Sequence, residues 1–111
     1  MKILITGGAG YIGSELTDHL LADGHEVKCV DTLMYDSTSL LRYITHPNFE
    51  FVKGDVRDQN LLSSRLAEAD VIIPLAALVG FPLCRDNPIA AQEINHEVNA
   101  WIAKNKSNDQ L

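Results

Sequence analysis

Short apolar stretches alternate along this chain with segments whose apolar residues recur at helical spacing. Four of the stretches predict buried strands, because they are rich in branched or aromatic residues and end at glycine or at polar turn residues. They cover residues 2–6, 26–30, 49–53 and 70–75. Strands that alternate with helices in this way are typical of a parallel sheet with right-handed crossovers.

Helical spacing predicts four helices, each bounded by a start or stop residue. The expected helices are residues 11–22, stopped by Asp23-Gly24; 37–44, capped by Asp36 or Ser37; 59–69, capped by Asp58; and a last helix that Asn87-Pro88 opens. The last helix carries an apolar stripe suited to packing on a sheet, namely Ala91, Ile94, Val98, Trp101 and Ile102. Residues 80–87 are expected to form a loop.

These elements together predict the α/β class. We expect a Rossmann-like doubly wound parallel sheet of about four strands, in the order 3-2-1-4, with helices on both faces. The length of 111 residues corresponds to one small domain, and the sequence contains no internal repeat or linker. We therefore expect a single domain over residues 1–111.

Composition and charge exclude several classes of protein. The formal net charge of −6 argues against binding to nucleic acid or to anionic lipid. The longest apolar run, residues 71–84, is too short to span a bilayer, and no signal peptide is recognisable. Two cysteines make no disulfide framework, and no Cys/His spacing resembles a zinc site. We expect a cytoplasmic protein without a metal, a membrane or a nucleic-acid partner.

The segment TGGAGYIG follows the first predicted strand and opens the first predicted helix. In this context, Gly7 allows the tight turn, Gly10 lets a pyrophosphate approach, and Gly13 lets the helix pack closely on the strand. The pyrophosphate would meet the backbone amides near Tyr11 and Ile12, at the positive end of the helix dipole. The alternative is a glycine-rich turn that binds nothing.

Asp31 directly follows the second predicted strand, 21 residues after Gly10, at the position where Rossmann folds carry an acidic residue. A carboxylate there accepts hydrogen bonds from the ribose hydroxyls and repels the 2′-phosphate of NADP. The next residues, Thr32 and Leu33, supply no positive charge for such a phosphate. The sequence therefore predicts NAD rather than NADP. The alternative is an aspartate that only orders a turn.

Four segments, TGGAGYIGSEL, VDTL, KGDVRD and VIIPLAALVG, resemble the extended short-chain dehydrogenase/reductases, which include the NAD-dependent nucleotide-sugar epimerases and dehydratases. The resemblance covers nearly the whole chain. It implies that Asp55 accepts a hydrogen bond from the adenine amino group and that the backbone of Val56 lies along the ring edge. Turn formation is the alternative role of Asp55.

The resemblance also implies that Leu75, Ala76 and Ala77 pass under the phosphates and the nicotinamide ribose of the cofactor, where small side chains permit close approach. Asn95 matches the family's asparagine near the central phosphates. Simple strand-end packing is the alternative for the first three residues, and a solvated polar side chain is the alternative for Asn95.

The sequence departs from the family pattern at several positions. Pro74 stands where members often carry histidine, and Val79 stands where the best-known sugar epimerases have lysine. The usual Gly-Thr after Asn95 is replaced by Val98 and Asn99. The identity of a UDP-galactose 4-epimerase is therefore in doubt. Arg85 either contacts a nucleotide phosphate or is a surface charge.

No catalytic residue is predicted in this chain. The family's Tyr-x-x-x-Lys pair, whose lysine lowers the pKa of the tyrosine, does not occur. The four histidines have no serine or cysteine in a nucleophile context; they are His19, His25, His46 and His96. In the family, the missing pair follows a fifth strand, and the chain stops before the later strands.

The sequence thus predicts the NAD-binding portion of a nucleotide-sugar epimerase or dehydratase, inactive alone, that would act by transient hydride transfer between a sugar carbon and NAD. The expected partners are NAD and, in a complete protein, a nucleotide-sugar substrate, with a homodimer as a candidate assembly. Two alternatives stay open. One is a non-catalytic dinucleotide-binding sensor, and the other is an interaction module that pairs through an open sheet edge.

Overall fold

The four strands form one parallel sheet in the order β3-β2-β1-β4. The computed structural model describes residues 1–35 and 37–111. The strands are β1 (Lys2–Thr6), β2 (Glu26–Asp31), β3 (Phe49–Lys53) and β4 (Val71–Pro74). β1 lies between β2 and β4, and β2 pairs with β3 on its other side. The class and the strand order predicted from the sequence are confirmed.

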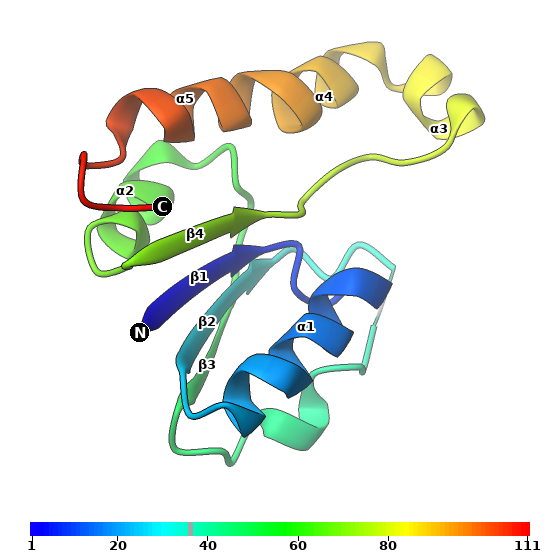
Figure 1. The fold of residues 1–111 in the computed structure, drawn as a ribbon. Coiled ribbons are helices and arrows are strands. Elements are labelled where there is room, and N and C mark those ends of the chain that lie inside the picture. Colours follow the sequence, from blue (N-terminus) through cyan, green and yellow to red (C-terminus); the bar gives the residue numbers. More distant parts are fainter. Residues whose placement is uncertain (36) are drawn as a thin grey trace.

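Helices cover both faces of the sheet (Figure 1). They are α1 (Tyr11–Ala22), the 3₁₀ helix η1 (Leu41–Tyr43), α2 (Gln59–Leu66), α3 (Phe81–Asp86), α4 (Pro88–Gln92), the π-helical turn η2 (Glu93–Glu97) and α5 (Val98–Asn105). Residues of α1 and η1 pack in the core of one face, and residues of α2, η2 and α5 pack in the core of the other. The sheet is therefore doubly wound, as expected.

Alternation along the strands supplies an apolar core to each face. In β1, Ile3 and Ile5 pack on the α1 side, whereas Leu4 packs on the α2 side. The predicted stripe of the last helix is confirmed: Ile94, Val98 and Ile102 are buried on the α2 side, and Ala91 and Trp101 pack against them. The sheet is thus apolar on both faces, as parallel sheets require.

The helix predicted over residues 37–44 is wrong. The segment is irregular except for the single 3₁₀ turn η1, and the alternative cap Asp36 lies outside the described residues. Ser37 accepts a hydrogen bond from the amide of Ser39 at 3.3 Å, and both hydroxyls reach the carbonyl of Ala9, at 2.9 and 2.8 Å. Side chains that bond to backbone groups in this way compete with helix formation.

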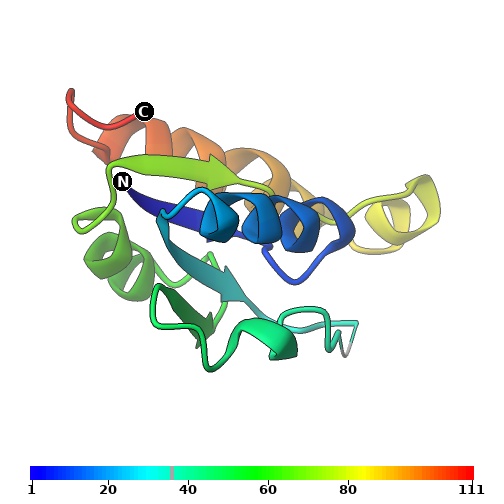
Figure 2. The same cartoon turned by 60° about the horizontal axis from the view of Figure 1, so that its bottom comes forward.

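Two further expectations fail around residues 80–92. The expected loop contains the short helix α3, which Figure 2 shows standing away from the sheet. Asn87 precedes α4 but does not cap it with its side chain, because its amide donates to the carbonyl of Leu83 at 3.0 Å and closes α3 instead. The proline at the first position of α4 has no N–H and needs no such cap.

Other predicted bounds differ by a few residues. α2 ends at Leu66 rather than residue 69, because the amides of Glu68 and Ala69 bond three residues back and tighten the chain into a turn. The cap by Asp58 is confirmed, since its carboxylate accepts from the amide of Leu61 at 3.1 Å. β2 extends to Asp31, and β4 is shorter than predicted at both ends.

Both chain ends lie at the amino-terminal end of the strands (Figures 1 and 2). Leu111 donates to the carbonyl of Asp70 at 3.1 Å and accepts from the amide of Ile72 at 2.8 Å, so it pairs with the outer edge of β4. The side-chain amide of Gln110 donates to the carbonyls of Leu66 and Ala69, both at 2.6 Å. Within the described residues, no helix has the length and apolar character needed to cross a bilayer.

Cys29 of β2 gives the fold a pH-dependent stability. Its side chain is fully buried, and burial raises the pKa of the thiol from about 9 to about 11. Below pH 9 the thiol is protonated in the folded and the unfolded chain. Between pH 9 and 11 only the unfolded chain loses this proton, so the free energy of unfolding falls, by on the order of 2 kcal/mol for this group.

Urea unfolding of the wild type and of Cys29→Ala at pH 8 and pH 11 measures this contribution. We expect a smaller loss of stability in the variant, because all other titrating groups are the same in both proteins. An equal loss in the two proteins would contradict a protonated, buried Cys29 thiol.

Candidate dinucleotide-binding site

The glycine-rich turn connects the carboxyl end of β1 to the start of α1. The amide of Gly7 donates to the carbonyl of Val30 at 2.8 Å, which ties the turn to β2. Gly7 itself has a φ of +72°, in the region that favours glycine. The amide of Gly10 donates to the carbonyl of Gly7 at 3.2 Å, and α1 begins at the next residue. The first amides of α1 have no partner within the helix and can bind an anion.

The three predicted glycines have different surroundings. A Cβ on Gly7 would lie 2.6 Å from the amide nitrogen of Ala76, and one on Gly13 would lie 2.6 Å from Cα of Gly8. Gly10 is open, because the nearest atom to such a Cβ is the carbonyl oxygen of Gly7 at 3.4 Å. Gly7 and Gly13 are therefore required by packing, whereas the side of Gly10 is free for a ligand.

Asp31 lies at the carboxyl end of β2 and faces the glycine-rich turn. One carboxylate oxygen accepts from the amide of Ala9 at 3.0 Å, and the other accepts from the amide of Leu33 at 2.8 Å. Leu33 has a positive φ of 57°, so the backbone after β2 is held in an unusual turn. Each carboxylate oxygen can accept a second hydrogen bond, and Asp31 therefore orders this turn without exhausting its capacity.

The hydroxyls of Ser37 and Ser39, which were not among the predicted site residues, hold the turn from the other side. Both reach the carbonyl of Ala9, whose amide Asp31 accepts. The peptide groups on either side of Ala9 are thus held by β2 and by the segment after it. The cluster of serine and threonine in residues 37–39 was the available indication, since these residues favour side-chain to backbone bonds.

A cavity of about 140 Å³ opens at the carboxyl ends of the strands. Eight of the predicted site residues line it: Gly7, Asp31, Thr32, Asp55, Val56, Leu75, Ala76 and Ala77. Five do not line it: Gly10, Tyr11, Ile12, Gly13 and Asn95. Tyr11 and Ile12 begin α1 and have exposed side chains. Their predicted contact with a ligand is through the backbone amides and does not involve these side chains. The fold thus brings the ends of all four strands to one cavity.

Asp55 and Arg57 form a fork-like ion pair in the turn between β3 and α2. The Arg57 guanidinium donates from Nη2 to one carboxylate oxygen at 2.7 Å and from Nε to the other at 3.0 Å. The backbone amide of Arg57 donates to the same carboxylate at 2.9 Å. Arg57 thereby holds the pKa of Asp55 below its usual range. The turn role of Asp55 is observed, and the adenine role assigned by resemblance stays a prediction.

Asn95 lies in η2, and its side chain bonds to the backbone of Leu78. Its Oδ1 accepts from the amide of Leu78 and its Nδ2 donates to the carbonyl of Leu78, both at 2.8 Å. This pair of bonds fastens the segment after β4 to the helix. The side chain of Asn95 is thus held by two hydrogen bonds to the backbone, rather than bonded to solvent alone. Arg85, by contrast, is exposed on α3 and pairs with Asp86 at 2.9 Å.

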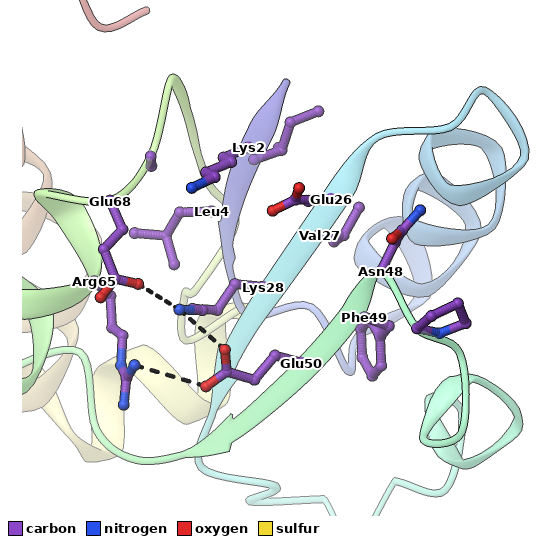
Figure 3. A pocket seen from close by; sticks show the side chains of 13 residues that line it. Lys2, Leu4, Glu26, Val27, Lys28, Asn48, Phe49, Glu50, Arg65 and Glu68 are labelled. Atoms are coloured by element: carbon purple, nitrogen blue, oxygen red, sulfur yellow. Dashed lines mark hydrogen bonds and ion pairs between the residues drawn. The ribbon is translucent and has the colours of Figure 1, made fainter.

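A larger cavity, of about 400 Å³, lies at the opposite, amino-terminal end of the strands (Figure 3). Lys28 sits there between Glu68 at 2.6 Å and Glu50 at 3.0 Å, and Arg65 lies 3.6 Å from Glu50. These opposite charges neutralise one another, and none of the predicted site residues lines this cavity. The candidate site is therefore the smaller cavity, at the carboxyl ends of the strands.

This arrangement is that of the Rossmann-type dinucleotide-binding folds: a glycine-rich turn before a helix, and an acidic residue at the end of the neighbouring strand. The sequence matches the profile of the NAD dependent epimerase/dehydratase family over residues 3–104. The chain belongs to this family. The family inferred from the sequence motifs is confirmed, and NAD, the expected cofactor, is the cofactor of the family.

Two curated relatives match most of this chain. Low-salt glycan biosynthesis protein Agl12 of Haloferax volcanii is 44% identical over 80 residues, which are 69% of this chain and 26% of that protein. UDP-glucuronic acid decarboxylase 1 of Danio rerio is 40% identical over 95 residues, which are 85% of this chain and 22% of that protein.

Solved structures show the same fold. DesIV, a dTDP-glucose 4,6-dehydratase from Streptomyces venezuelae solved with NAD bound, is 31% identical and superposes with a TM-score of 0.83. The match covers 94% of this chain and 35% of that one. The chain thus spans 22–26% of the curated relatives' lengths and about a third of this solved homologue.

Proposed function

We propose that this chain is the NAD-binding portion of a nucleotide-sugar epimerase or dehydratase, with residues 1–111 as one cofactor-binding domain. The observation that carries the proposal is the cavity at the carboxyl ends of the strands, where the glycine-rich turn meets Asp31, Asp55 and Val56. Ligands of open α/β sheets bind at this edge. Family membership supports the reaction class, and the relatives' names support a nucleotide-sugar substrate.

Each part of the cofactor has a proposed contact. The pyrophosphate lies on the open side of Gly10, against the first amides of α1, at Tyr11 and Ile12. The adenine ribose meets the Asp31 carboxylate, with Thr32 beside it. These contacts require no movement of Gly7 or Gly13, whose positions are set by packing.

The two ends of the dinucleotide have separate contacts. The adenine amino group donates to Asp55, and the ring edge follows the backbone of Val56. The nicotinamide side runs over residues 75–77, where Leu75, Ala76 and Ala77 line the cavity and leave room for close approach. Asn95 contributes by holding Leu78, the next residue of that segment.

Bound NAD would supply transient oxidation of a sugar carbon by accepting its hydride and then returning it. The chain's own residues bind and orient the dinucleotide. Proton transfer from the sugar hydroxyl needs a base, and the tyrosine and lysine that perform it in the family are absent from this sequence. We therefore propose that residues 1–111 bind NAD and do not catalyse the reaction alone.

Dinucleotide selectivity tests this function. We expect the wild type to bind NAD at least about tenfold more tightly than NADP, because the Asp31 carboxylate repels the 2′-phosphate. Asp31→Ala should weaken NAD binding about tenfold and reduce the preference for NAD over NADP. Titration calorimetry with both dinucleotides measures the two affinities.

Asp58→Ala is the matched control, since Asp58 caps α2 and does not line the cavity. It should lower stability and leave the selectivity unchanged. Equal affinities of the wild type for NAD and NADP would contradict the role of Asp31, and the absence of binding to either would contradict the proposed function.

A second candidate is a non-catalytic dinucleotide sensor, a function that requires NAD binding alone. The coding sequence after codon 111 distinguishes the two. A continuation that encodes a fifth strand and this pair supports the enzyme, whereas a stop codon together with NAD binding supports the sensor. For either, we propose the cytoplasm as the location, because Cys29 and Cys84 are free thiols.

A further inference from the structure

Arg57 contacts Asp55 more extensively than a turn requires. Three nitrogens of one residue, the backbone amide, Nε and Nη2, donate to the two oxygens of one carboxylate at 2.7–3.0 Å. Such a planar fork fixes the direction of a carboxylate as well as its distance. Asp55 therefore has one orientation at the edge of the cavity, which both residues line.

A second contact holds the arginine itself. Its Nη1 donates to Glu93 at 2.9 Å, and Glu93 belongs to η2, the turn that also carries Asn95. The guanidinium therefore joins the β3–α2 turn to the helix that fastens the segment after β4. Arg57 lies between two parts of the chain that are far apart in sequence and that both border the candidate site.

Stability does not explain this arrangement. The side chains of Arg57, Asp55 and Glu93 are 40%, 36% and 37% exposed. Ion pairs this exposed to solvent contribute little to folding. The adjacent Val56, in contrast, is buried in the core and anchors the turn without help from the charges. What the ion pair adds is a fixed orientation of the Asp55 carboxylate, set by the donors of Arg57.

We propose that Arg57 is a positioning residue for recognition of the adenine amino group, acting through the Asp55 carboxylate. An ionised carboxylate only accepts hydrogen bonds, and it therefore selects a ring that presents an amino group over one that presents a carbonyl. The inference rests on the proposed function, because it requires the dinucleotide in this cavity. Arg57 thus affects which base is bound without contacting the base itself.

Nicotinamide hypoxanthine dinucleotide, in which a carbonyl replaces the adenine amino group, tests the inference against NAD. We expect the wild type to bind NAD about tenfold more tightly than this analogue, the contribution of one hydrogen bond to a charged group. Arg57→Gln should reduce this ratio to about twofold or less, close to the value for Asp55→Asn. Arg57→Lys, which keeps the charge and loses the fork, should give an intermediate ratio.

Glu93→Gln is the matched control, because it removes the other ion pair of Arg57 and leaves the fork on Asp55 in place. Its ratio should stay within about twofold of the wild type. Thermal unfolding of every variant separates loss of structure from loss of selectivity.

The possible outcomes are distinct. A wild-type ratio near one, or an Arg57→Gln variant that folds and keeps the wild-type ratio, overturns the inference while NAD binding stands. If Arg57→Gln does not fold, Arg57→Lys provides the test instead. An Arg57→Lys variant with the same ratio of affinities as the wild type overturns the inference. A wild type that binds neither dinucleotide overturns the proposed function as well.

Discussion

Replacing Gly7 with alanine is expected to lower the free energy of unfolding by about 3–5 kcal/mol and to abolish NAD binding. Two physical causes add together. The φ of +72° disfavours any residue with a Cβ. In addition, the new methyl group would lie 2.6–2.8 Å from backbone atoms of Leu75 and Ala76, which belong to the segment after β4 and cannot move without displacing it.

Gly24→Ala separates the two causes. Gly24 has a similar φ of +84°, but no atom lies within 4 Å of the position its Cβ would take. This control should cost only about 1 kcal/mol, the conformational part alone. Urea unfolding of both variants gives the difference. A Gly7→Ala variant as stable as Gly24→Ala would contradict the close packing of the glycine-rich turn on the segment after β4.

Gly10→Ala should weaken NAD binding by about 100-fold while the fold remains within about 1 kcal/mol of the wild type. The backbone at Gly10 is extended, with a φ of −72°, which alanine adopts without strain. The nearest atom to the added methyl group is 3.4 Å away, so the free chain has room for it. The methyl group would occupy the side from which the pyrophosphate approaches α1.

Calorimetric titration with NAD, together with urea unfolding, tests the prediction. Gly24→Ala serves again as the control, because it lies at the far end of α1 and should bind NAD like the wild type. Unchanged NAD affinity in Gly10→Ala would mean that the pyrophosphate lies elsewhere. A large loss of stability in the same variant would mean that Gly10, like Gly7, is required by packing.

The sequence pattern was sufficient to predict those elements whose local preferences agree with their packing in the core. β1, β3 and α1 have the predicted bounds, because their apolar spacing and their terminal glycines or polar residues agree with the tertiary packing. The helix over residues 37–44 failed because Ser37 and Ser39 form their hydrogen bonds with Ala9, about thirty residues earlier in the sequence. No local pattern contains that partner.

In the candidate site, too, some features were predicted from the sequence and others were seen only in the structure. The spacing of Gly7, Gly10 and Gly13 identified the turn, and the position of Asp31 after a strand identified its acidic neighbour. Arg57 belongs to the KGDVRD motif, but no role was predicted for it, and its contact with Glu93 joins residues 36 positions apart. The place of Asn95 near the phosphates, implied by resemblance, stays a prediction, and the structure adds that its side-chain amide is bonded to Leu78, 17 residues earlier.

Sequence alone thus sufficed for the family, the parallel sheet and the glycine-rich turn, since each of these depends on residue type and short-range spacing. The tertiary structure was needed for contacts between distant parts of the chain: the open side of Gly10, the serines on Ala9, and the ion pair of Arg57 with Glu93. Parallel strands bring their carboxyl ends to one edge from distant parts of the chain. Contacts at that edge therefore depend on the assembled sheet rather than on neighbours in sequence.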